Sequence, residues 1–512
     1  MTTLREMLAG VAVLRADGPL DIPVAGLAYD SRRVTPGSLF VAIRGYHTDG
    51  HAYVDQAVAR GAAAVVVDAR QWDEPTPDGV TLVAVIDSRA ALAPLAAAFY
   101  GYPARQLQTI GITGTKGKST TTDLVSQVLD ACGRRTGLIS TVDFKVGPRR
   151  WPNRTRQSTP EAPEVQSLLA EMVADGCDTA VIEATSHALS ARWNRLSGAL
   201  FDVAVFLNLT HEHLDYHGSF EQYRADKARL FELLGERVPG SGLRRGELWA
   251  IGNADDPSCG VFLAAAPSSA RRLTFGIEAN ADVRAHDLRT GPSGSSLLVH
   301  SPWGSAPLHL GLPGRFNVSN ALATLSVALS QGLPFEQALS ALSQARGPRG
   351  RMEPITMGQP FDVIVDYAHN PDSFAQVLAM LRPLTRGRMI AVFGSAGERD
   401  VAKRAIQGEI AGRYCDLLVL TDEDPRGEDR EAILAEIAVG AERAGLRPGS
   451  GYLIVPDRPA AVATALAAAG PGDLVLLLGK GHEGSIIYAD HSLPYDEADE
   501  ARRALAALGY GG

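Results

Sequence analysis

The sequence predicts an α/β protein of three domains: a small N-terminal α/β domain, a central doubly wound domain and a Rossmann-like C-terminal domain. Three observations lead to this prediction. At about 100–200 residues per domain, a chain of 512 residues has room for roughly three domains. Short apolar runs alternate with amphipathic segments, as in βαβ units. Two breaks in this alternation divide the chain into residues 1–103, 104–346 and 347–512.

Each domain has its own predicted strands, and strands that alternate with helices predict mostly parallel sheets covered on both faces. In the N-terminal domain the apolar runs lie at 39–43, 62–68 and 80–87, before a Pro-containing linker at 100–108. In the central domain they lie at 109–115, 178–184, 203–209 and 247–253, with a hairpin at 297–312. In the C-terminal domain, after the break GPRGRMEPI, they lie at 361–367, 388–394, 416–422 and 473–479.

Composition and charge exclude several classes of protein. A formal net charge of −9 argues against nucleic acid as a partner, because phosphate neutralisation needs clustered Lys and Arg. The sequence has no apolar run long enough for a membrane span and no secretory signal at the N-terminus. The cysteines show no paired spacing, which disfavours disulfides and zinc and fits a reducing, cytoplasmic location. They are Cys132, Cys177, Cys259 and Cys415.

The segment GTKGKST follows a buried strand and precedes a helix, which is the context of a phosphate-binding loop. Its glycines let backbone N–H groups approach an anion, Lys118 would reach the β/γ-phosphates, and the Ser119 hydroxyl would bind Mg²⁺. The strict GxxxxGK[ST] pattern is not met, because Ile112 occupies the first Gly position. The central domain is therefore predicted to be a P-loop ATPase domain that binds ATP through Gly114, Thr115, Gly117, Lys118, Ser119 and Thr120.

The GTxGK[ST] form of this loop resembles that of the Mur ligases and of folylpolyglutamate synthase. The latter has no counterpart of residues 1–103, so the resemblance is to the Mur ligases. Later segments are similar to the MurE branch, which adds the third residue of the peptidoglycan stem peptide. They are IEATSHAL, NLTHEHLDYHG, YRADK, GRFNVSN, DYAHNP, EDPR and GKGHE.

The resemblance implies a site for two Mg²⁺ ions. Glu183 and His213 each lie after a predicted strand, at the edge of the sheet where the phosphate loop is expected. By likeness to MurE both are magnesium ligands, together with Ser119. Lys227 by itself is a lysine on an amphipathic helix, but the resemblance implies that it is carbamylated and holds the second Mg²⁺. We expect no zinc at His211 and His217, whose spacing does not fit a zinc motif.

The resemblance also assigns catalytic roles to Lys118, His213 and Lys227, and further ATP contacts to the second half of the chain. Asn317 would lie near the adenine, Asp366 would meet the ribose, and Arg351 would lie near the phosphates.

The UDP-sugar and its peptide are expected to contact two parts of the chain. In the N-terminal domain, Ser31, His47 and Thr48 resemble the loops that hold uridine and diphosphate. In the central domain, two loops resemble those that contact the muramoyl peptide: Ser158 and Thr159, then Thr185 and Ser186. One arginine follows the SHAL motif in the family, whereas this sequence offers both Arg192 and Arg195.

The pocket for the incoming amino acid is implied at Arg399, Glu423, Asp424, Arg426, Gly479 and Glu483. The fork of Arg399 suits an α-carboxylate, and Glu483 would face a side-chain amine. Asp424 replaces the Asn of the DNPR motif found in diaminopimelate-adding enzymes. Ionised Asp cannot donate to a distal carboxylate but attracts an ammonium group. This favours ornithine or lysine, whereas Arg426 favours meso-diaminopimelate, which remains the alternative.

The expected activity is ATP-dependent ligation of a diamino acid to the D-Glu γ-carboxylate of UDP-MurNAc-L-Ala-D-Glu through an acyl phosphate, by a monomer in the cytoplasm. The expected partners are small molecules only: the UDP-MurNAc-dipeptide, ATP and the diamino acid. Alternatives are another Mur-type ligase, a P-loop kinase, or a non-catalytic UDP-sugar or nucleotide sensor. A sensor is disfavoured because Lys118, Glu183, His213 and Lys227 are all present.

Overall fold

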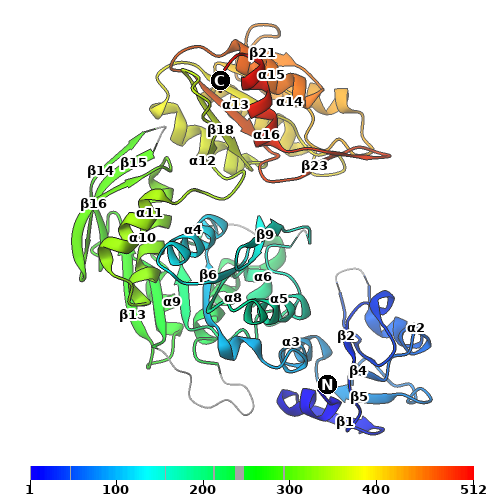
Figure 1. The fold of residues 1–512 in the computed structure, drawn as a ribbon. Helices are drawn as coiled ribbons and strands as arrows, with labels where there is room; N and C mark the ends of the chain where they lie inside the picture. The colour runs from blue at the N-terminus through cyan, green and yellow to red at the C-terminus, as the bar shows by residue number, and fades with distance from the viewer. Residues whose placement is uncertain are drawn as a thin grey trace. The chain divides into compact units, whose positions relative to one another are not determined.

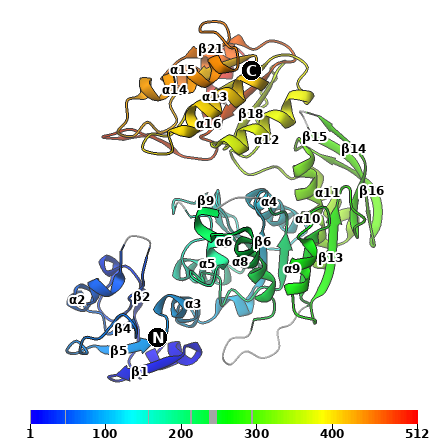
Figure 2. The same cartoon turned by 180° about the vertical axis from the view of Figure 1, so that it is seen from behind.

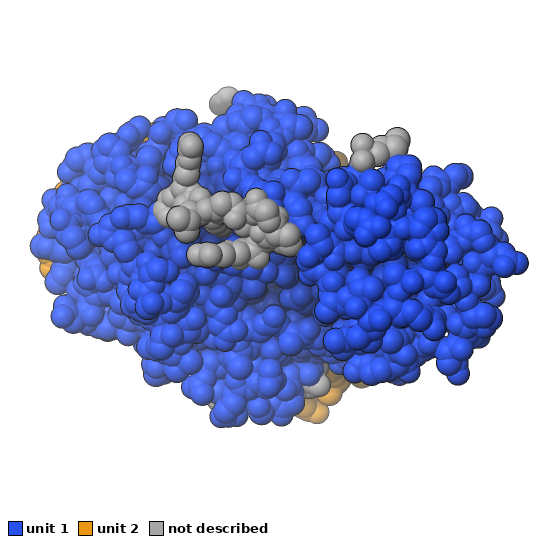
Figure 3. All heavy atoms as spheres, turned by 90° about the horizontal axis from the view of Figure 1, so that it is seen from below, with its two compact units in different colours: residues 1–286, 299–306, 319–342 blue, residues 287–298, 307–318, 343–512 orange. Residues whose placement is uncertain are grey.

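The computed structural model describes residues 2–45, 48–155, 157–210, 214–236, 247–291 and 294–511, with only the backbone at 214 and 215 (Figure 1). The chain divides into two compact units. Unit 1 comprises residues 1–286, 299–306 and 319–342, and unit 2 comprises residues 287–298, 307–318 and 343–512 (Figure 3). None of the helices within the described ranges has the length and apolar character that crossing a bilayer requires.

The N-terminal part of unit 1 is built on a sheet of order β1-β5-β4-β3-β2. Strands β3, β4 and β5 are buried along their whole length, because apolar cores lie on both faces of this sheet. The elements are α1 (Leu4–Met7), η1 (Leu8–Gly10), β1 (Val13–Asp17), β2 (Gly26–Ala28), η2 (Ser31–Arg33), β3 (Ser38–Val41), η3 (Gly50–Tyr53), α2 (Val54–Ala59), β4 (Ala64–Asp68), β5 (Thr81–Val85), α3 (Ser88–Phe99) and η4 (Pro103–Gln106).

The central sheet runs in the order β16-β15-β14-β13-β12-β11-β6-β10-β7-β8-β9. Its middle strands are parallel, whereas β8 and β9 add an antiparallel edge. The first half of this part comprises β6 (Gln108–Thr113), α4 (Lys118–Ala131), β7 (Thr136–Ile139), β8 (Asp143–Val146), β9 (Arg149–Pro152), α5 (Ala162–Ala174), β10 (Thr179–Glu183), α6 (Ser186–Leu189) and β11 (Val203–Phe206).

The remaining elements complete this sheet and its helices, and the predicted strands at 297–312 appear as the neighbours β15 and β16. They are α7 (Leu214–His217), α8 (Phe220–Glu232), β12 (Trp249–Asn253), α9 (Cys259–Ala265), β13 (Arg271–Gly276), β14 (Val283–Gly291), β15 (Gly294–Ser301), β16 (Gly304–Leu310), α10 (Arg315–Ser330) and α11 (Phe335–Gln344).

Helices of the central part cover both faces of the sheet (Figures 1 and 2). Alternate residues of a strand point to opposite faces, and Ile182 and Phe206 join the core beneath α5, α8 and α9. Helix α4 contributes nothing to that core and packs on β6, β7 and β10. The doubly wound arrangement is therefore confirmed, and it gathers the carboxyl ends of β6, β10 and β11 at one edge.

The C-terminal sheet has the order β17-β18-β22-β19-β20-β21 and is parallel except for β17. One core lies beneath α12, α13 and α14, and a second beneath α15 and α16, as the Rossmann-like pattern predicted. The elements are β17 (Glu353–Pro354), β18 (Asp362–Asp366), α12 (Pro371–Leu381), η5 (Arg382–Leu384), β19 (Met389–Phe393), α13 (Ala402–Tyr414), β20 (Leu417–Leu420), α14 (Arg430–Arg443), β21 (Tyr452–Ile454), α15 (Arg458–Ala468), β22 (Leu474–Leu478), β23 (Ser485–Ile487), β24 (Ser492–Pro494) and α16 (Glu497–Ala507).

Candidate functional site

The phosphate loop lies between β6 and α4, as the sequence predicts. Gly117 caps α4 with φ +84°, which glycine adopts without strain, and a side chain there would collide with Asn320. The Lys118 ammonium donates to the carbonyls of Gly114 (3.0 Å) and Thr115 (2.8 Å). The loop therefore holds a cation beside a helix N-terminus, where backbone N–H groups and the helix dipole favour a bound anion.

Asn208, just after β11, fixes the shape of this loop. Its side-chain oxygen accepts from the Lys116 N–H (2.9 Å) and its amide donates to the Lys116 carbonyl (3.0 Å). Its own carbonyl accepts from the Thr115 N–H (2.8 Å). The loop is thus bound to the neighbouring strand end through three hydrogen bonds.

Glu183 ends β10 beside the phosphate loop, because β10 pairs in parallel with β6 and brings Glu183 opposite Ile112. Its carboxylate is buried, with 2% of the residue exposed. One oxygen, Oε2, accepts from the Ser119 hydroxyl and from both the backbone N–H and the hydroxyl of Thr141, each at 2.9 Å. Two of the predicted magnesium ligands, Ser119 and Glu183, are therefore in direct contact.

The donors at this contact fit Mg²⁺. A carboxylate and a hydroxyl are hard oxygen ligands, and Mg²⁺ in nucleotide sites is bound by one or two protein groups plus phosphates and waters. Among the described residues no group of three or more His, Cys, Asp or Glu side chains is arranged to hold a metal, so a dedicated all-protein cage is not found there. His213, another predicted ligand, lies outside the described residues, as does His211.

Lys227 lies on α8 with 1% of the residue exposed. Its ammonium donates to the Gly114 carbonyl (2.7 Å), which also accepts from Lys118, and lies 4.7 Å from the centroid of the Tyr223 ring. Lys227 is therefore not a solvated lysine, as an isolated amphipathic helix would suggest. Its side chain contacts the phosphate loop from helix α8.

His217 occupies a buried network behind this site. One ring nitrogen lies 2.7 Å from an Asp226 carboxylate oxygen and the other 3.1 Å from the Ser186 hydroxyl. All three residues are buried. Both ring nitrogens of His217 therefore have partners within the protein.

The two predicted muramoyl-peptide loops meet beside Glu183. The Thr159 hydroxyl donates to the Glu183 carbonyl (2.6 Å) and lies 3.2 Å from the Thr185 hydroxyl. Thr185 also caps the short helix α6, which begins at Ser186. Ser158 precedes Thr159 in the chain and is half-buried.

Arg192 and Arg195 have different surroundings. Arg195 is buried, donates to the Thr159 carbonyl (3.0 Å) and pairs with Glu161 at 2.8 Å. Arg192 is exposed and lies over the Trp193 ring. Of the two, Arg195 is the one that the structure joins to the loop of Thr159.

The N-terminal candidates lie at two turns of unit 1. The Ser31 hydroxyl donates to the Gln56 side chain (2.6 Å) and is buried, whereas Thr48 is exposed at a turn closed by the Gly45 N–H. His47 lies outside the described residues.

Unit 2 holds the other predicted ATP contacts. Asp366, at the end of β18, accepts from the N–H groups of Met352 and Ala368, both at 2.8 Å. Burial raises the pKa of this carboxyl against the opposing effect of Arg351, whose guanidinium stacks on Tyr367. Asn317 is buried, and its amide donates to the Pro313 carbonyl (2.8 Å).

The predicted amino-acid pocket contains an acidic cluster, defined as Glu423, Asp424 and Glu483. The fully buried Lys480 ammonium donates to Asp424 (2.8 Å) and to Glu483 (2.7 Å). Asp424 also accepts from the Ile487 N–H (2.9 Å). The charge of Asp424 is therefore already compensated within the protein, by contacts that the EDPR motif does not reveal.

Glu423 is the least satisfied member of the acidic cluster. Its Oε2 atom is buried and has no hydrogen-bond partner among the described residues. Burial raises the pKa of Glu423 to about 7, partly offset by Lys403 and Lys480. A side chain at Gly479 would approach that oxygen to 3.2 Å, so glycine leaves space beside it.

The two predicted arginines differ in exposure. Arg399 is exposed in the loop after β19. Arg426 is half-buried with φ +54°, and its N–H donates to the Ile487 carbonyl (3.0 Å). The structure therefore brings Arg426 to the segment that also contacts Asp424.

The fold and the phosphate loop together define a nucleotide-binding α/β enzyme of the P-loop type, and the chain contains a second α/β unit. Family models match three stretches of the chain. The model "Mur ligase family, catalytic domain" matches residues 23–100, "Mur ligase middle domain" matches 112–328, and "Mur ligase, glutamate ligase domain" matches 350–481. The chain belongs to the Mur ligase family and is a MurE-like ATP-dependent ligase.

Two curated relatives and one solved structure resemble nearly the whole chain. UDP-N-acetylmuramyl-tripeptide synthetase of Roseiflexus sp. (strain RS-1) is 60% identical, covering 96% of this chain and 97% of the relative. A UDP-N-acetylmuramoyl-L-alanyl-D-glutamate–2,6-diaminopimelate ligase of Syntrophomonas wolfei is 40% identical, covering 98% and 99%. A solved structure with that ligase name has a TM-score of 0.70 at 28% identity, covering 99% of this chain and all of the other.

Sequence reasoning missed three residues that build the site. Thr141 is a second partner of Glu183, Asn208 fixes the phosphate loop, and Lys480 compensates the acidic cluster. Asn208 and Lys480 lie within the motifs NLTHEHLDYHG and GKGHE, and their position directly after apolar strands was a usable signal. Thr141 carried no such signal.

Proposed function

We propose that this chain joins a diamino acid to the D-Glu γ-carboxylate of UDP-MurNAc-L-Ala-D-Glu at the expense of ATP, in peptidoglycan synthesis. The γ-carboxylate attacks the γ-phosphorus, ADP leaves and an acyl phosphate forms. The amine then attacks the acyl carbon, loses a proton and displaces phosphate. The observation that carries the proposal is the contact between Ser119 and Glu183 beside the phosphate loop.

The chain's own groups would bind and orient the reactants. Lys118 would turn from the loop carbonyls toward the β/γ-phosphates, and Asn208 would keep the loop N–H groups in place. Thr159 and Arg195 would hold the muramoyl peptide, with Arg195 favoured over Arg192 because it is joined to Thr159. Two Mg²⁺ ions, when bound at Ser119, Glu183, His213 and Lys227, would neutralise the charge on the transferring phosphoryl group.

We also propose that Lys227 is carbamylated. As an ammonium it shares the Gly114 carbonyl with Lys118, so two cations lie at one acceptor in a buried site. Like charges at such a position repel each other. A carbamate replaces one of them by an anion, which suits a neighbouring Mg²⁺.

For the incoming amino acid we propose ornithine or lysine, with meso-diaminopimelate as the alternative. The unsatisfied Glu423 oxygen supports an ammonium group as its ligand. The support from Asp424 is weaker because Lys480 compensates it. The names of the relatives leave both open, since one is a tripeptide synthetase and another a 2,6-diaminopimelate ligase.

The direct test is phosphate release by the purified protein with ATP, Mg²⁺ and UDP-MurNAc-dipeptide, measured separately with ornithine, lysine and meso-diaminopimelate. Release that requires both the dipeptide and a diamino acid is the expected result. Release with meso-diaminopimelate but not with ornithine or lysine would contradict the proposed preference for ornithine or lysine. No release with any of the three amino acids would contradict the proposed ligation.

We further propose three domains at 1–103, 104–346 and 347–512, each of which contains one of the matched family models. Since UDP-sugars and ATP are cytoplasmic metabolites, we propose that the enzyme acts there, as a monomer.

A further inference from the structure

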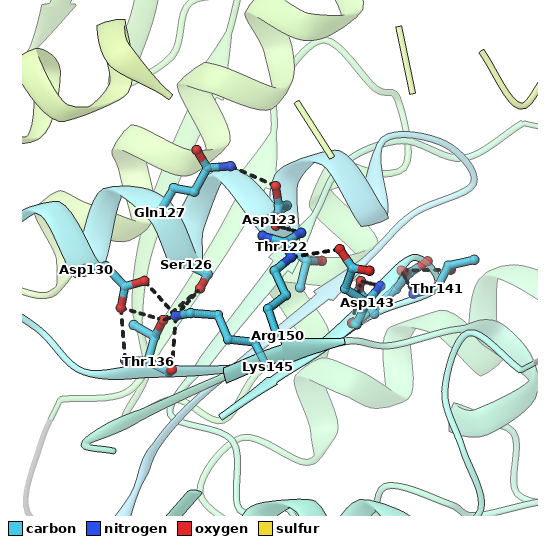
Figure 4. A network of polar contacts seen from close by, with 12 residues as sticks. Thr122, Asp123, Ser126, Gln127, Asp130, Thr136, Thr141, Asp143, Lys145 and Arg150 are labelled. Carbon is cyan, nitrogen blue, oxygen red and sulfur yellow. Dashed lines mark hydrogen bonds and ion pairs between the residues drawn. The ribbon is translucent and has the colours of Figure 1, made fainter. Parts of the chain in front are cut away.

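A polar network with the buried carboxylates of Asp123 and Asp143 and the more exposed side chain of Arg150 joins the phosphate-loop helix to the hairpin of β8 and β9 (Figure 4). Asp123, Ser126 and Asp130 recur at helical spacing on one side of α4. Lys145 and Arg150 lie opposite each other across the hairpin. An ordinary α/β helix would present apolar residues to its sheet at such positions, so this charged contact calls for an explanation.

The network has two separate halves. Near the start of α4, Arg150 donates to Asp123 (2.6 Å) and to Asp143 (2.7 Å), and these two carboxylates are 1% and 2% exposed. Figure 4 shows the guanidinium between them. Toward the end of α4, Lys145 donates to Asp130 (2.6 Å).

The same Lys145 ammonium also donates to the hydroxyls of Ser126 (3.2 Å) and Thr136 (2.6 Å). At 1.5 Å per residue along a helix, Asp123 is about 6 Å from Ser119 and Asp130 is about 16 Å from it. Only the Arg150 half is therefore close to the phosphate loop.

The Arg150 half connects the same two segments that meet at Glu183. Ser119 belongs to the first turn of α4, and Thr141 lies two residues before Asp143; both donate to Glu183 Oε2. If Ser119 and Glu183 ligate Mg²⁺, their mutual hydrogen bond is given up. The bridge from Asp123 through Arg150 to Asp143 does not involve the metal ligands and persists.

We propose that Arg150 is a positioning residue that keeps Ser119 and Glu183 at the spacing Mg²⁺ requires when their own hydrogen bond is released. This inference rests on the proposed function, because it assumes that these two residues bind the metal of Mg²⁺-ATP. Buried ion pairs are often replaceable by apolar groups without loss of stability. We therefore assign the charged bridge a role in geometry rather than in stability, which the thermal unfolding below tests.

The test compares two matched sets of neutralised variants. Arg150→Met alone would leave two buried carboxylates uncompensated, so the test variant is the triple Asp123→Asn/Asp143→Asn/Arg150→Met. The control is Asp130→Asn/Lys145→Met, which removes an ion pair between the same two elements far from the loop. For each we would measure thermal unfolding, the Mg²⁺ concentration for half-maximal binding of a fluorescent ATP analogue, and the KM and kcat for ATP.

The triple variant should need roughly tenfold more Mg²⁺ for half-maximal nucleotide binding, as when groups that orient metal ligands are removed. The KM of the triple variant for ATP should rise more than its kcat falls. The single variant Arg150→Lys, which keeps both carboxylates and a cation between them, should have a Mg²⁺ requirement between those of the wild type and the triple variant. The control should keep the wild-type Mg²⁺ requirement even if its melting temperature falls. Equal Mg²⁺ requirements in the triple variant and the wild type, or equal shifts in the triple variant and the control, would overturn the inference.

The two proposals fail in different ways. A wild-type protein that forms no amide product while the triple variant still shows the Mg²⁺ shift would overturn the proposed function and support the role of Arg150.

Discussion

The phosphate loop and the acidic cluster both contain charged side chains that are buried or half-buried, but they differ in how these charges are satisfied. At the phosphate loop, Lys118 and Glu183 are hydrogen-bonded within the protein, to loop carbonyls and to three donor groups respectively. In the acidic cluster, Lys480 compensates Asp424 and Glu483, whereas Glu423 keeps an oxygen with no partner among the described residues.

This difference in charge compensation indicates how each site should respond when its ligand binds. The loop is assembled before ligand binding, so nucleotide and metal replace existing contacts with little reorganisation, which is what electrostatic catalysis needs. An unsatisfied buried carboxylate is costly until a partner arrives. Binding of the diamino acid at the acidic cluster should therefore depend on the protonation of Glu423. Binding of nucleotide at the phosphate loop should not depend on it.

The largest expected effect is at the loop. Lys118→Met removes the cation that we propose reaches the transferring phosphoryl group and should lower kcat by about 10²–10³-fold, as loss of one charge-stabilising group does. Lys116→Met, two residues earlier, is the matched control and should lose far less. Phosphate release and thermal unfolding of both variants would be measured. Similar losses in the two would contradict the role given to Lys118.

The second effect separates carbamate from ammonium at Lys227. If Lys227 is the carbamate that we propose, Lys227→Ala removes an anion beside the metal and should lower phosphate release by roughly 10²-fold. Added acetate or formate should restore part of the rate by entering the space that the side chain leaves. Lys227→Arg keeps a cation, fills that space and should show no such rescue. Equal behaviour of the two variants with added carboxylate would argue against a carbamate.

Much of this architecture was predictable from the sequence, because apolar runs and Gly-rich turns report on local structure. The strand before Gly114 and the strand ending at Glu183 were both placed correctly, and parallel pairing then brings their ends together. Charge compensation was not predictable in this way. Thr141 and Lys480 act on groups 42 and 56 residues away in the chain, so their partners depend on the tertiary fold.

The third effect concerns pH. Burial raises the pKa of Glu423 from 4.5 to about 7, so an ammonium ligand that needs the ionised form should bind more weakly at low pH. At pH 6 about one-tenth of the carboxyl is ionised, and KM for the diamino acid should be roughly ten times its value at pH 8. Glu423→Gln should have a high KM with little pH dependence, and initial rates from pH 6 to 8 would show it.

The same pKa shift of Glu423 predicts that stability changes with pH in the opposite direction to ligand binding: binding strengthens as the pH rises, whereas stability falls. A carboxyl whose pKa is raised on folding binds more protons in the folded state between pH 4.5 and 7, so the free energy of unfolding should fall as the pH rises through this range. Glu423→Gln should remove that part of the fall. A wild-type KM that is constant with pH would contradict an ionised Glu423 as the ligand's partner.

The smallest expected effect is on the choice of amino acid. Asp424→Asn restores the residue of the DNPR motif and should shift relative kcat/KM toward meso-diaminopimelate, but by less than about tenfold, because Lys480 and the Ile487 N–H already compensate Asp424. Asp422→Asn is the control: this buried carboxylate pairs with Arg430 rather than with Lys480, so its loss should affect stability and leave the preference unchanged. Competition between lysine and meso-diaminopimelate measures the ratio directly. A shift of a hundredfold or more would mean that Asp424 faces the substrate uncompensated, and the two sites would then differ more than their contacts indicate.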